Sequence, residues 1–206
     1  LFHSLGSAGA LYALLAPYFV SYSLFAKQTS FGETILGHFQ VARPDPSPPK
    51  VAHFTDTFDD TNGVAQALHQ QLEAVRMLDR NYTILTCRAE RAYERGVRQF
   101  MPVGSIDLPG HEGMKLLTPP FLQMVDWCYR EGITHLHVST PGPVGLAALG
   151  IARILGLPIS GTYHSSAIPE FVKTLTEDSY VEDMSWKYML WFHNQLDAIY
   201  VPAKAV

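Results

Sequence analysis

The feature that most constrains the fold is an alternation of short apolar runs with longer helical patterns, which begins at Lys50. The segments between the apolar runs keep the three- and four-residue spacing of one helix face. The pattern predicts strands at 51–55, 82–87, 97–106, 133–138, 159–163 and 198–201, with a Pro-Val-Gly interruption inside 97–106. It predicts helices near 64–78, 121–130, 145–155, 170–176 and 181–195. Strands that alternate with helices favour an α/β fold, in which a parallel sheet carries helices on both faces.

A Pro-rich segment marks a boundary before this pattern. Residues 42–49 hold four prolines in eight positions, which excludes a helix or a central strand. We interpret the segment as an extended, semi-rigid linker. The expected organisation is therefore a helical tail of an upstream domain in residues 1–41, a linker in 42–49 and an α/β domain in 50–206.

The helical tail opens with an uncharged stretch. Residues 1–26 contain no Asp, Glu, Lys or Arg, although charged residues make up 17% of the chain. Apolar side chains recur at helical spacing along one face, namely Leu11, Leu14, Leu15, Tyr18, Phe19, Tyr22 and Phe25. Serines on the other face and the internal Pro17 favour an amphipathic helix over a membrane span, which is apolar all round. A second short helix is expected over 31–39, and a membrane span is the alternative.

Composition excludes several classes of protein. A net charge of −4 gives no basic footprint for nucleic acid, and 47% hydrophobic residues exclude a disordered chain. The two cysteines, Cys87 and Cys128, lie far apart in segments that read as strand and helix. They predict neither a disulfide framework nor a zinc site, so a reducing, cytoplasmic setting is expected.

The first loop of interest follows the first predicted strand. Parallel sheets bind ligands at the carboxyl ends of their strands, near the point where the strand order reverses. Asn62 and Gly63 stand directly before a helix, whose free N–H groups could hold a phosphate. The alternative is that Asn62 only caps the helix. For Asp56 and Asp59 a capping or turn role is favoured over a metal or phosphoryl-aspartate site.

Two further loops follow predicted strands. His135 and His137 share one face of a strand, but no third ligand is visible, so no metal site is predicted. The turn 140–143 (Thr-Pro-Gly-Pro) is rigid and leads into a helix. His164 ends a strand, where a histidine can meet a ligand and change protonation near neutral pH. Its alternative is a hydrogen-bonded structural role.

Taken in order, four stretches resemble the N-terminal domain of retaining GT-B glycosyltransferases, in the large family that includes bacterial α-mannosyltransferases. The stretches are 52–58 with 62–64, 135–149, 161–165 and 197–203. The resemblance covers about residues 50–206 and implies a Rossmann-like parallel sheet that forms one half of a GT-B fold. In such enzymes two Rossmann-like domains face each other across a cleft, and the C-terminal domain binds most of the sugar nucleotide.

The resemblance also implies roles for single residues. Asn62 and Gly63 would approach the donor diphosphate, although many relatives carry Gly-Gly there. His164 would act as the catalytic residue beside the transferred sugar. The residues that would line the cleft and the acceptor are Asp56, Thr140, Pro141, Gly142, Tyr163 and Ser165.

The expected activity is transfer of a hexosyl group from a nucleotide sugar, such as GDP-mannose or UDP-glucose, to a lipid or glycan acceptor, with retention of configuration. No other cofactor and no metal are expected. Because the C-terminal domain would supply the positive clamp on the leaving diphosphate, the 206-residue piece alone is expected to be inactive. The alternatives are a non-catalytic nucleotide- or sugar-binding module and, more weakly, a phosphatase built on Asp56. A cytoplasmic protein with peripheral contact at the inner membrane face would fit a lipid acceptor.

Overall fold

The computed structural model describes residues 2–39, 48–88, 94–107, 115–164, 169, 173 and 179–201. Its elements in chain order are α1 (Phe2–His38), β1 (Val51–Phe54), α2 (Gly63–Met77), β2 (Tyr82–Cys87), β3 (Val97–Phe100), β4 (Gly104–Asp107), β5 (Lys115–Thr118), α3 (Phe121–Arg130), β6 (His135–Val138), α4 (Pro143–Leu155), β7 (Ile159–Thr162), α6 (Ser179–His193) and β8 (Ala198–Tyr200).

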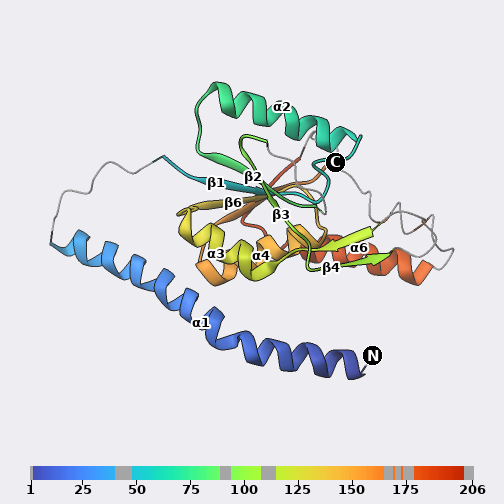
Figure 1. Cartoon of the computed structure of the whole chain (residues 1–206), viewed down its shortest axis with the longest axis horizontal. Helices are drawn as coiled ribbons and strands as arrows, with labels where there is room; N and C mark the ends of the chain where they lie inside the picture. Colours follow the sequence, from blue (N-terminus) through green and yellow to red (C-terminus); the bar gives the residue numbers. More distant parts are fainter. Residues whose placement is uncertain are drawn as a thin grey trace.

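Six of these strands form one parallel sheet in the order β3-β2-β1-β6-β7-β8. The order runs outward in both directions from β1 and β6, so the strand order reverses between these two neighbours. Helix α2 covers one face of the sheet, whereas α3, α4 and α6 lie on the other (Figure 1). The predicted Rossmann-like parallel sheet with helices on both faces is therefore confirmed.

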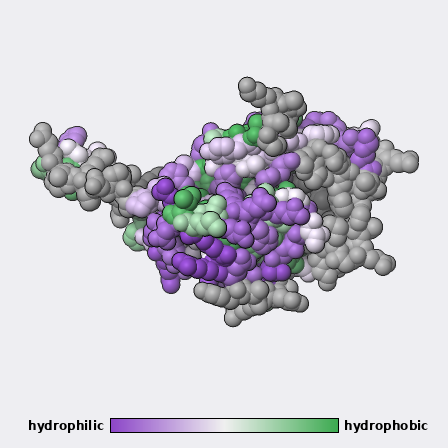
Figure 2. All heavy atoms as spheres, turned by 90° about the horizontal axis from the view of Figure 1, so that it is seen from above, coloured by the Kyte–Doolittle hydropathy of each residue, from purple (hydrophilic) through white to green (hydrophobic). Residues whose placement is uncertain are grey.

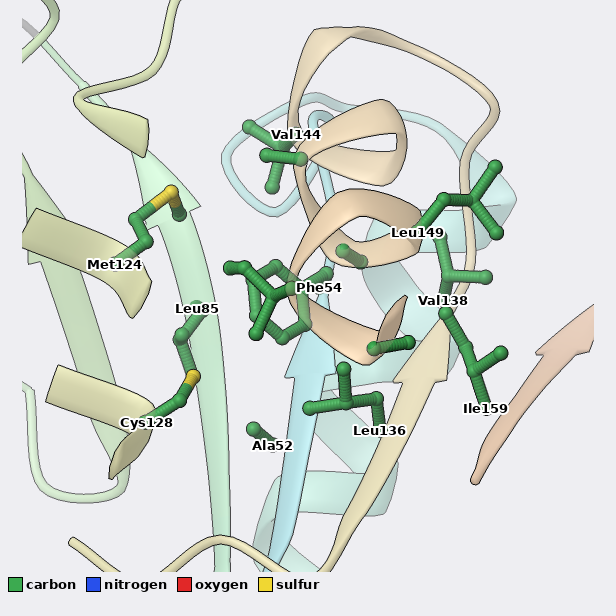
Figure 3. Packing of buried hydrophobic residues seen from close by; sticks show 14 of the residues in the cluster. Ala52, Phe54, Leu85, Met124, Cys128, Leu136, Val138, Val144, Leu149 and Ile159 are labelled. Carbon is green, nitrogen blue, oxygen red and sulfur yellow. The ribbon is translucent and has the colours of Figure 1, made fainter. Parts of the chain in front are cut away.

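The main core lies between the sheet and the α3–α4 layer. Period-two alternation directs Ala52 and Phe54 of β1, and Leu136 and Val138 of β6, to this face, where they are fully buried. Figure 3 shows α4 packed over these strands and α3 packed beside β2. The apolar surface removed from water here is the main force that holds α3 and α4 on the sheet.

The other face is divided. Beneath α2, a smaller buried cluster joins Phe58, Leu68, Leu72 and Ile84. Seen from the side of α2, the described surface is mostly hydrophilic (Figure 2). Beyond this cluster, β1 and β6 place His53 and His137 side by side in register on the same face. This polar half of the sheet leads directly to the candidate site.

One predicted strand is divided at the interruption expected within it. The expected strand 97–106 divides into β3 in the main sheet and β4, which pairs antiparallel with β5 in a separate two-stranded sheet. Pro102 lies between the two strands and lacks the N–H group that a continuous ladder needs. The next N–H group, that of Val103, already donates to Thr118 across the small sheet at 2.9 Å.

The expected helical tail, residues 1–41, contains one long helix rather than two. Helix α1 continues through Pro17 and packs across α3 and α4. The ring of Phe19 lies edge-on to Phe121, with centroids 5.7 Å apart, and the Tyr22 hydroxyl donates to Asp126 at 2.9 Å. Helix α1 is thus docked on the α/β domain through these residues.

The apolar face predicted for this helix is only partly covered. Leu14, Tyr18 and Phe25 belong to that face but are exposed, because α1 crosses the domain over a short length. The described helices include no candidate for a membrane span, because none combines the necessary length with a sufficiently apolar stretch. Most of the linker 42–49 and of the expected helix 170–176 lies outside the described residues, and the upstream domain stays a prediction.

Candidate functional site at the carboxyl edge of the sheet

The loops after β1 and β6 are held together by Asp56 and Thr140. The backbone N–H of Asp56 donates to Thr140 Oγ1 at 2.8 Å, and the Thr140 hydroxyl donates back to Asp56 Oδ2 at 2.7 Å. The N–H of Val144 donates to the other carboxylate oxygen at 2.9 Å. Both oxygens of Asp56 are therefore engaged within the domain.

This carboxylate lies at the positive end of α4. A negative charge is stabilised there by the helix dipole and by the free N–H groups of the first turn. Burial raises the pKa of Asp56, while the hydrogen bonds from Val144 and Thr140 act in the opposite direction. The sequence favoured a capping role for Asp56, and the structure shows one, although for the helix after β6 rather than its own. Its predicted place in the cleft stays a prediction.

Two glycines make this close approach possible. A Cβ at Gly142 would stand 2.5 Å from Asp56 Oδ2, and a Cβ at Gly145 would stand 1.9 Å from the Thr140 carbonyl oxygen. Both distances are shorter than a van der Waals contact allows. The Thr-Pro-Gly-Pro turn is thus shaped by the packing of its backbone against the first loop.

Helix α6 holds the same turn from the other side. The Tyr188 hydroxyl donates to the carbonyl oxygen of Pro141. Burial, followed by the nearby Asp56, raises the pKa of Tyr188 to about 12, so this phenol keeps its proton. Tyr163 packs its ring against His193, also on α6, at 5.3 Å between centroids. Thr140, Pro141, Gly142 and Tyr163 are therefore tied to one rigid frame.

Asn62 and Gly63 begin helix α2. The side-chain oxygen of Asn62 accepts a hydrogen bond from the N–H of Ala65 at 2.9 Å. The backbone carbonyl of Asn62 accepts from the N–H of Gln66 at 3.2 Å. The N-cap role of Asn62 is thus seen directly. The first two N–H groups of α2, those of Gly63 and Val64, remain at the open end of the helix. A Cβ at Gly63 would meet no atom within 4 Å, so the approach to these groups is open.

The loop between β1 and α2 is anchored in two more places. Phe58 is buried under α2 and packs on His69 at 4.4 Å between ring centroids. Asp59 forms an ion pair with Arg88, which follows β2, at 2.5 Å. In the described part of the chain, the buried hydroxyl oxygen of Thr57 has no hydrogen-bond partner.

A connected set of polar side chains leads from the sheet to His164. Tyr82 OH is bonded to His53 Nδ1, and His53 Nε2 lies 2.5 Å from Ser139 Oγ. Ser139 Oγ lies 3.3 Å from Nε2 of His164. His53 and Ser139 are buried, whereas His164 is half-buried. The histidine predicted to be catalytic is thus the outer end of a buried hydrogen-bonded chain.

His137 stands beside this chain but is bonded elsewhere. Its Nδ1 lies 2.8 Å from Ser160 Oγ and its Nε2 lies 2.9 Å from Thr162 Oγ1, while its ring stacks edge-on to His53 at 4.5 Å. Burial lowers the pKa of His53 and of His164, and it lowers that of His137 to about 4. The three imidazoles are therefore neutral at neutral pH.

These histidines do not form a metal site. Within the described residues, no group of three or more His, Cys, Asp or Glu is arranged to hold a metal ion. Both nitrogens of His53 and of His137 are already bonded to hydroxyl groups. His135 is exposed at the start of β6, where its Nδ1 lies 2.9 Å from Thr134 Oγ1.

Sequence reasoning missed part of this arrangement. His53 and Ser139 lie inside the stretches that carried the resemblance but received no role, and Tyr82 and Tyr188 were not singled out. A usable signal is present for His53, which sits in a strand whose other residues are apolar. Ser165, which was predicted to line the acceptor, lies outside the described residues.

A shallow pocket exists elsewhere, at the amino ends of β7 and β8. It is lined by Leu149, Ala152, Arg153, Leu157, Ile159, Gln195 and Asp197. In it, the Asp197 carboxylate accepts from the backbone N–H of Ile159 at 2.8 Å. The pocket lies at the opposite edge of the sheet, so we do not assign the candidate site to it.

Comparison with known proteins agrees with this geometry. The sequence profile of Glycosyltransferase Family 4 matches residues 61–206. The sulfoquinovosyl transferase SQD2 of Arabidopsis thaliana is 32% identical over 71 residues, which is 34% of this chain. The matched region spans 14% of that relative's length.

The close approach at Gly145 can be tested by unfolding. We expect Gly145→Ala to lower the free energy of unfolding by about 1–3 kcal/mol, because the added methyl group collides with the Thr140 carbonyl. Gly63→Ala is the matched control, since its methyl group meets nothing and alanine favours the helix. Urea titration of both variants measures the difference. Equal stability of the two would contradict the packing described here.

The buried imidazoles predict a pH dependence. The folded form holds His137 neutral down to about pH 4, whereas the unfolded chain takes up a proton near pH 6.5. The free energy of unfolding should therefore fall as the pH is lowered from about 7 to about 4. His137→Asn should make this slope shallower than that of the wild type. Urea midpoints across this pH range test the point, and an unaltered slope in His137→Asn would refute it.

Proposed function

The chain belongs to glycosyltransferase family 4, and from this premise we propose that it forms the acceptor-side half of a retaining GT-B enzyme. The reaction proposed is transfer of a hexosyl group from a nucleotide sugar to a lipid or glycan acceptor. The relative from Arabidopsis thaliana is by name a transferase of a sugar group, which supports a sugar as the transferred group. GDP-mannose and UDP-glucose are the donors to test first.

The observation that carries the proposal is that predicted site residues lie together at one edge of the sheet, within the region that the family profile matches. The open N-terminus of α2, the Thr140–Gly142 turn and His164 all follow carboxyl ends of neighbouring parallel strands. In open α/β sheets this edge, at the reversal of strand order, is where ligands bind. All of these residues lie within 61–206.

The proposed diphosphate contact is the first turn of α2. Two N–H groups of this turn, those of Gly63 and Val64, are unused by the capping Asn62. N–H groups and the positive end of a helix dipole together favour an anion. The empty space around the Gly63 Cα lets a phosphate approach the backbone closely.

The proposed role of His164 is to hold the transferred sugar or its leaving group. The imidazole is half-buried and anchored through Nε2, so its position is fixed before a substrate arrives. Asp56 is the one carboxylate among the predicted site residues, and both its oxygens bond within the domain. This supports a front-face reaction without a carboxylate nucleophile rather than a double displacement.

A second α/β domain would complete the site in this proposal. It would supply the positive charge that neutralises the leaving diphosphate, which is the largest electrostatic requirement of such a transfer. Both cysteines are free and buried, which supports a reducing, cytoplasmic location. The lipid acceptor would be met at the inner membrane face.

Asn62 separates helix capping from donor binding. Asp and Ser cap helices about as well as Asn, so Asn62→Asp and Asn62→Ser should both keep the fold. Only the Asp variant places a negative charge against the diphosphate. We expect its KM for the donor to rise about tenfold, equivalent to about 1.4 kcal/mol, while Asn62→Ser stays near the wild type. Equal donor KM values for the two variants would place the diphosphate elsewhere.

His164 is tested by turnover in the protein that carries the second domain. We expect His164→Ala to lower kcat by roughly 10²-fold, because the sugar loses its positioning contact. His135→Ala is the control at an exposed histidine of the same sheet. A radiolabelled sugar-transfer assay measures both variants. Wild-type kcat in His164→Ala would remove His164 from the mechanism, and turnover by the 206-residue chain alone would contradict the need for a second domain.

A further inference from the structure

A buried hydrogen-bonded chain ends at His164 and begins at a phenol on β2. Tyr82 OH bonds His53 Nδ1, His53 Nε2 bonds Ser139 Oγ, and Ser139 Oγ bonds His164 Nε2. We infer that this chain fixes the tautomer of His164, with Nε2 as acceptor and Nδ1 carrying the proton. Tyr82, His53 and Ser139 are then positioning residues for His164.

The direction of the chain follows from its first bond. A phenol O–H is a stronger donor than an imidazole N–H, and an imidazole nitrogen is a better acceptor than a phenol oxygen. Burial also raises the pKa of Tyr82, so the phenol keeps its proton. Tyr82 therefore donates to His53 Nδ1, which sets the remaining proton of the neutral His53 ring on Nε2.

The next two bonds have no freedom left. His53 Nε2–H donates to Ser139 Oγ, and a serine hydroxyl that accepts this bond has its single proton available for one other acceptor. Within the described residues that acceptor is Nε2 of His164. Because the His164 ring is neutral and its Nε2 accepts, its proton must stand on Nδ1.

The neighbouring histidine does not interfere with this order. His137 touches the His53 ring but bonds both of its own nitrogens to Ser160 and Thr162 on β7. The hydrogen-bonded chain from Tyr82 to His164 is thus separate from the hydrogen bonds that His137 forms with Ser160 and Thr162. Its inner members, His53 and Ser139, are 1% and 5% exposed, so water does not compete for these bonds.

The consequence concerns what His164 can bind. In the part of the chain that the structure describes, Nδ1 of His164 has no hydrogen-bond partner. A fixed Nδ1–H is a donor, so it selects an oxygen acceptor, such as a sugar hydroxyl or a phosphate oxygen, and disfavours a donor group. This use of the tautomer rests on the proposed function, whereas the tautomer itself does not.

Histidine nitrogen spectra of the 206-residue chain test the inference directly. In a long-range ¹H–¹⁵N spectrum of ¹⁵N-histidine-labelled protein near pH 7.5, an unprotonated ring nitrogen resonates far downfield of a protonated one. The His164 signals are assigned by their loss in His164→Gln. We expect a downfield Nε2 and an upfield Nδ1 for His164 in the wild type. The opposite pattern in the wild-type spectrum would by itself overturn the inference.

Two pairs of variants then test the chain itself. Tyr82→Phe should remove the donor that orients it, so His164 should move toward the Nε2–H form, and Tyr200→Phe is the control on β8. Ser139→Ala should have the same effect, with Ser160→Ala as the control serine on β7. If Ser139→Ala does not fold, Ser139→Thr, which keeps the hydroxyl, should retain the wild-type pattern. A His164 spectrum unchanged in Tyr82→Phe would refute the relay, even if transfer activity proved to need His164.

Discussion

The arrangement of the site depends on one carboxylate at one helix end. Asp56 follows β1, and it binds Thr140 and the first turn of α4, both of which follow β6. These are the two strands between which the order of the sheet reverses. The hydrogen bonds of Asp56 therefore join the two loops that follow these neighbouring strands. Together with the hydrogen bond from Tyr188 to Pro141, they fix the turn that carries Pro141 and Gly142.

The two sheet faces have different tasks, and the alternation of side chains along β1 and β6 produces both. Ala52, Phe54, Leu136 and Val138 build the apolar core against α3 and α4. The residues between them, above all His53 and His137, face the other side and form hydrogen bonds with hydroxyl groups. His53 and His137 are thus held by strands that a rigid apolar layer supports from behind. Such support keeps groups in place better than a mobile loop does.

Much of the fold could be predicted from the sequence because its signals are local. The spacing of Leu68 and Leu72, and the apolar run that contains Leu136, define a helix and a strand without help from the rest of the chain. The Pro-Val-Gly interruption of 97–106 is visible in the sequence, but the pairing of β4 with β5 in a separate sheet is not, since no strand is predicted at 115–118. Which side chains of α1 are buried depends on its contacts with α3 and α4. The exposed Tyr18 and the packed Phe19 therefore look alike in the sequence.

For the site, sequence reasoning found His164, the outer end of the hydrogen-bonded chain, but none of the other members, Tyr82, His53 and Ser139. Asn62 and His164 stand in loops, where their types are unusual enough to be noticed. Ser139 and Tyr82 are ordinary residues of a parallel sheet, and their roles arise only from the strand order that places β2, β1, β6 and β7 side by side. The relation between Asp56 and Val144 likewise requires that order to be known.

The open space at Gly63 has a practical consequence for studying this protein. Cys87 and Cys128 are both buried, and burial raises the pKa of Cys87 to about 11 and that of Cys128 to about 12. Neither thiol is therefore a reactive thiolate at neutral pH. A cysteine introduced in place of Gly63 would be the single accessible thiol of these 206 residues, at a point where an added side chain meets nothing. A fluorophore attached there would lie at the N-terminus of α2, and a change in its emission would report occupancy of the site.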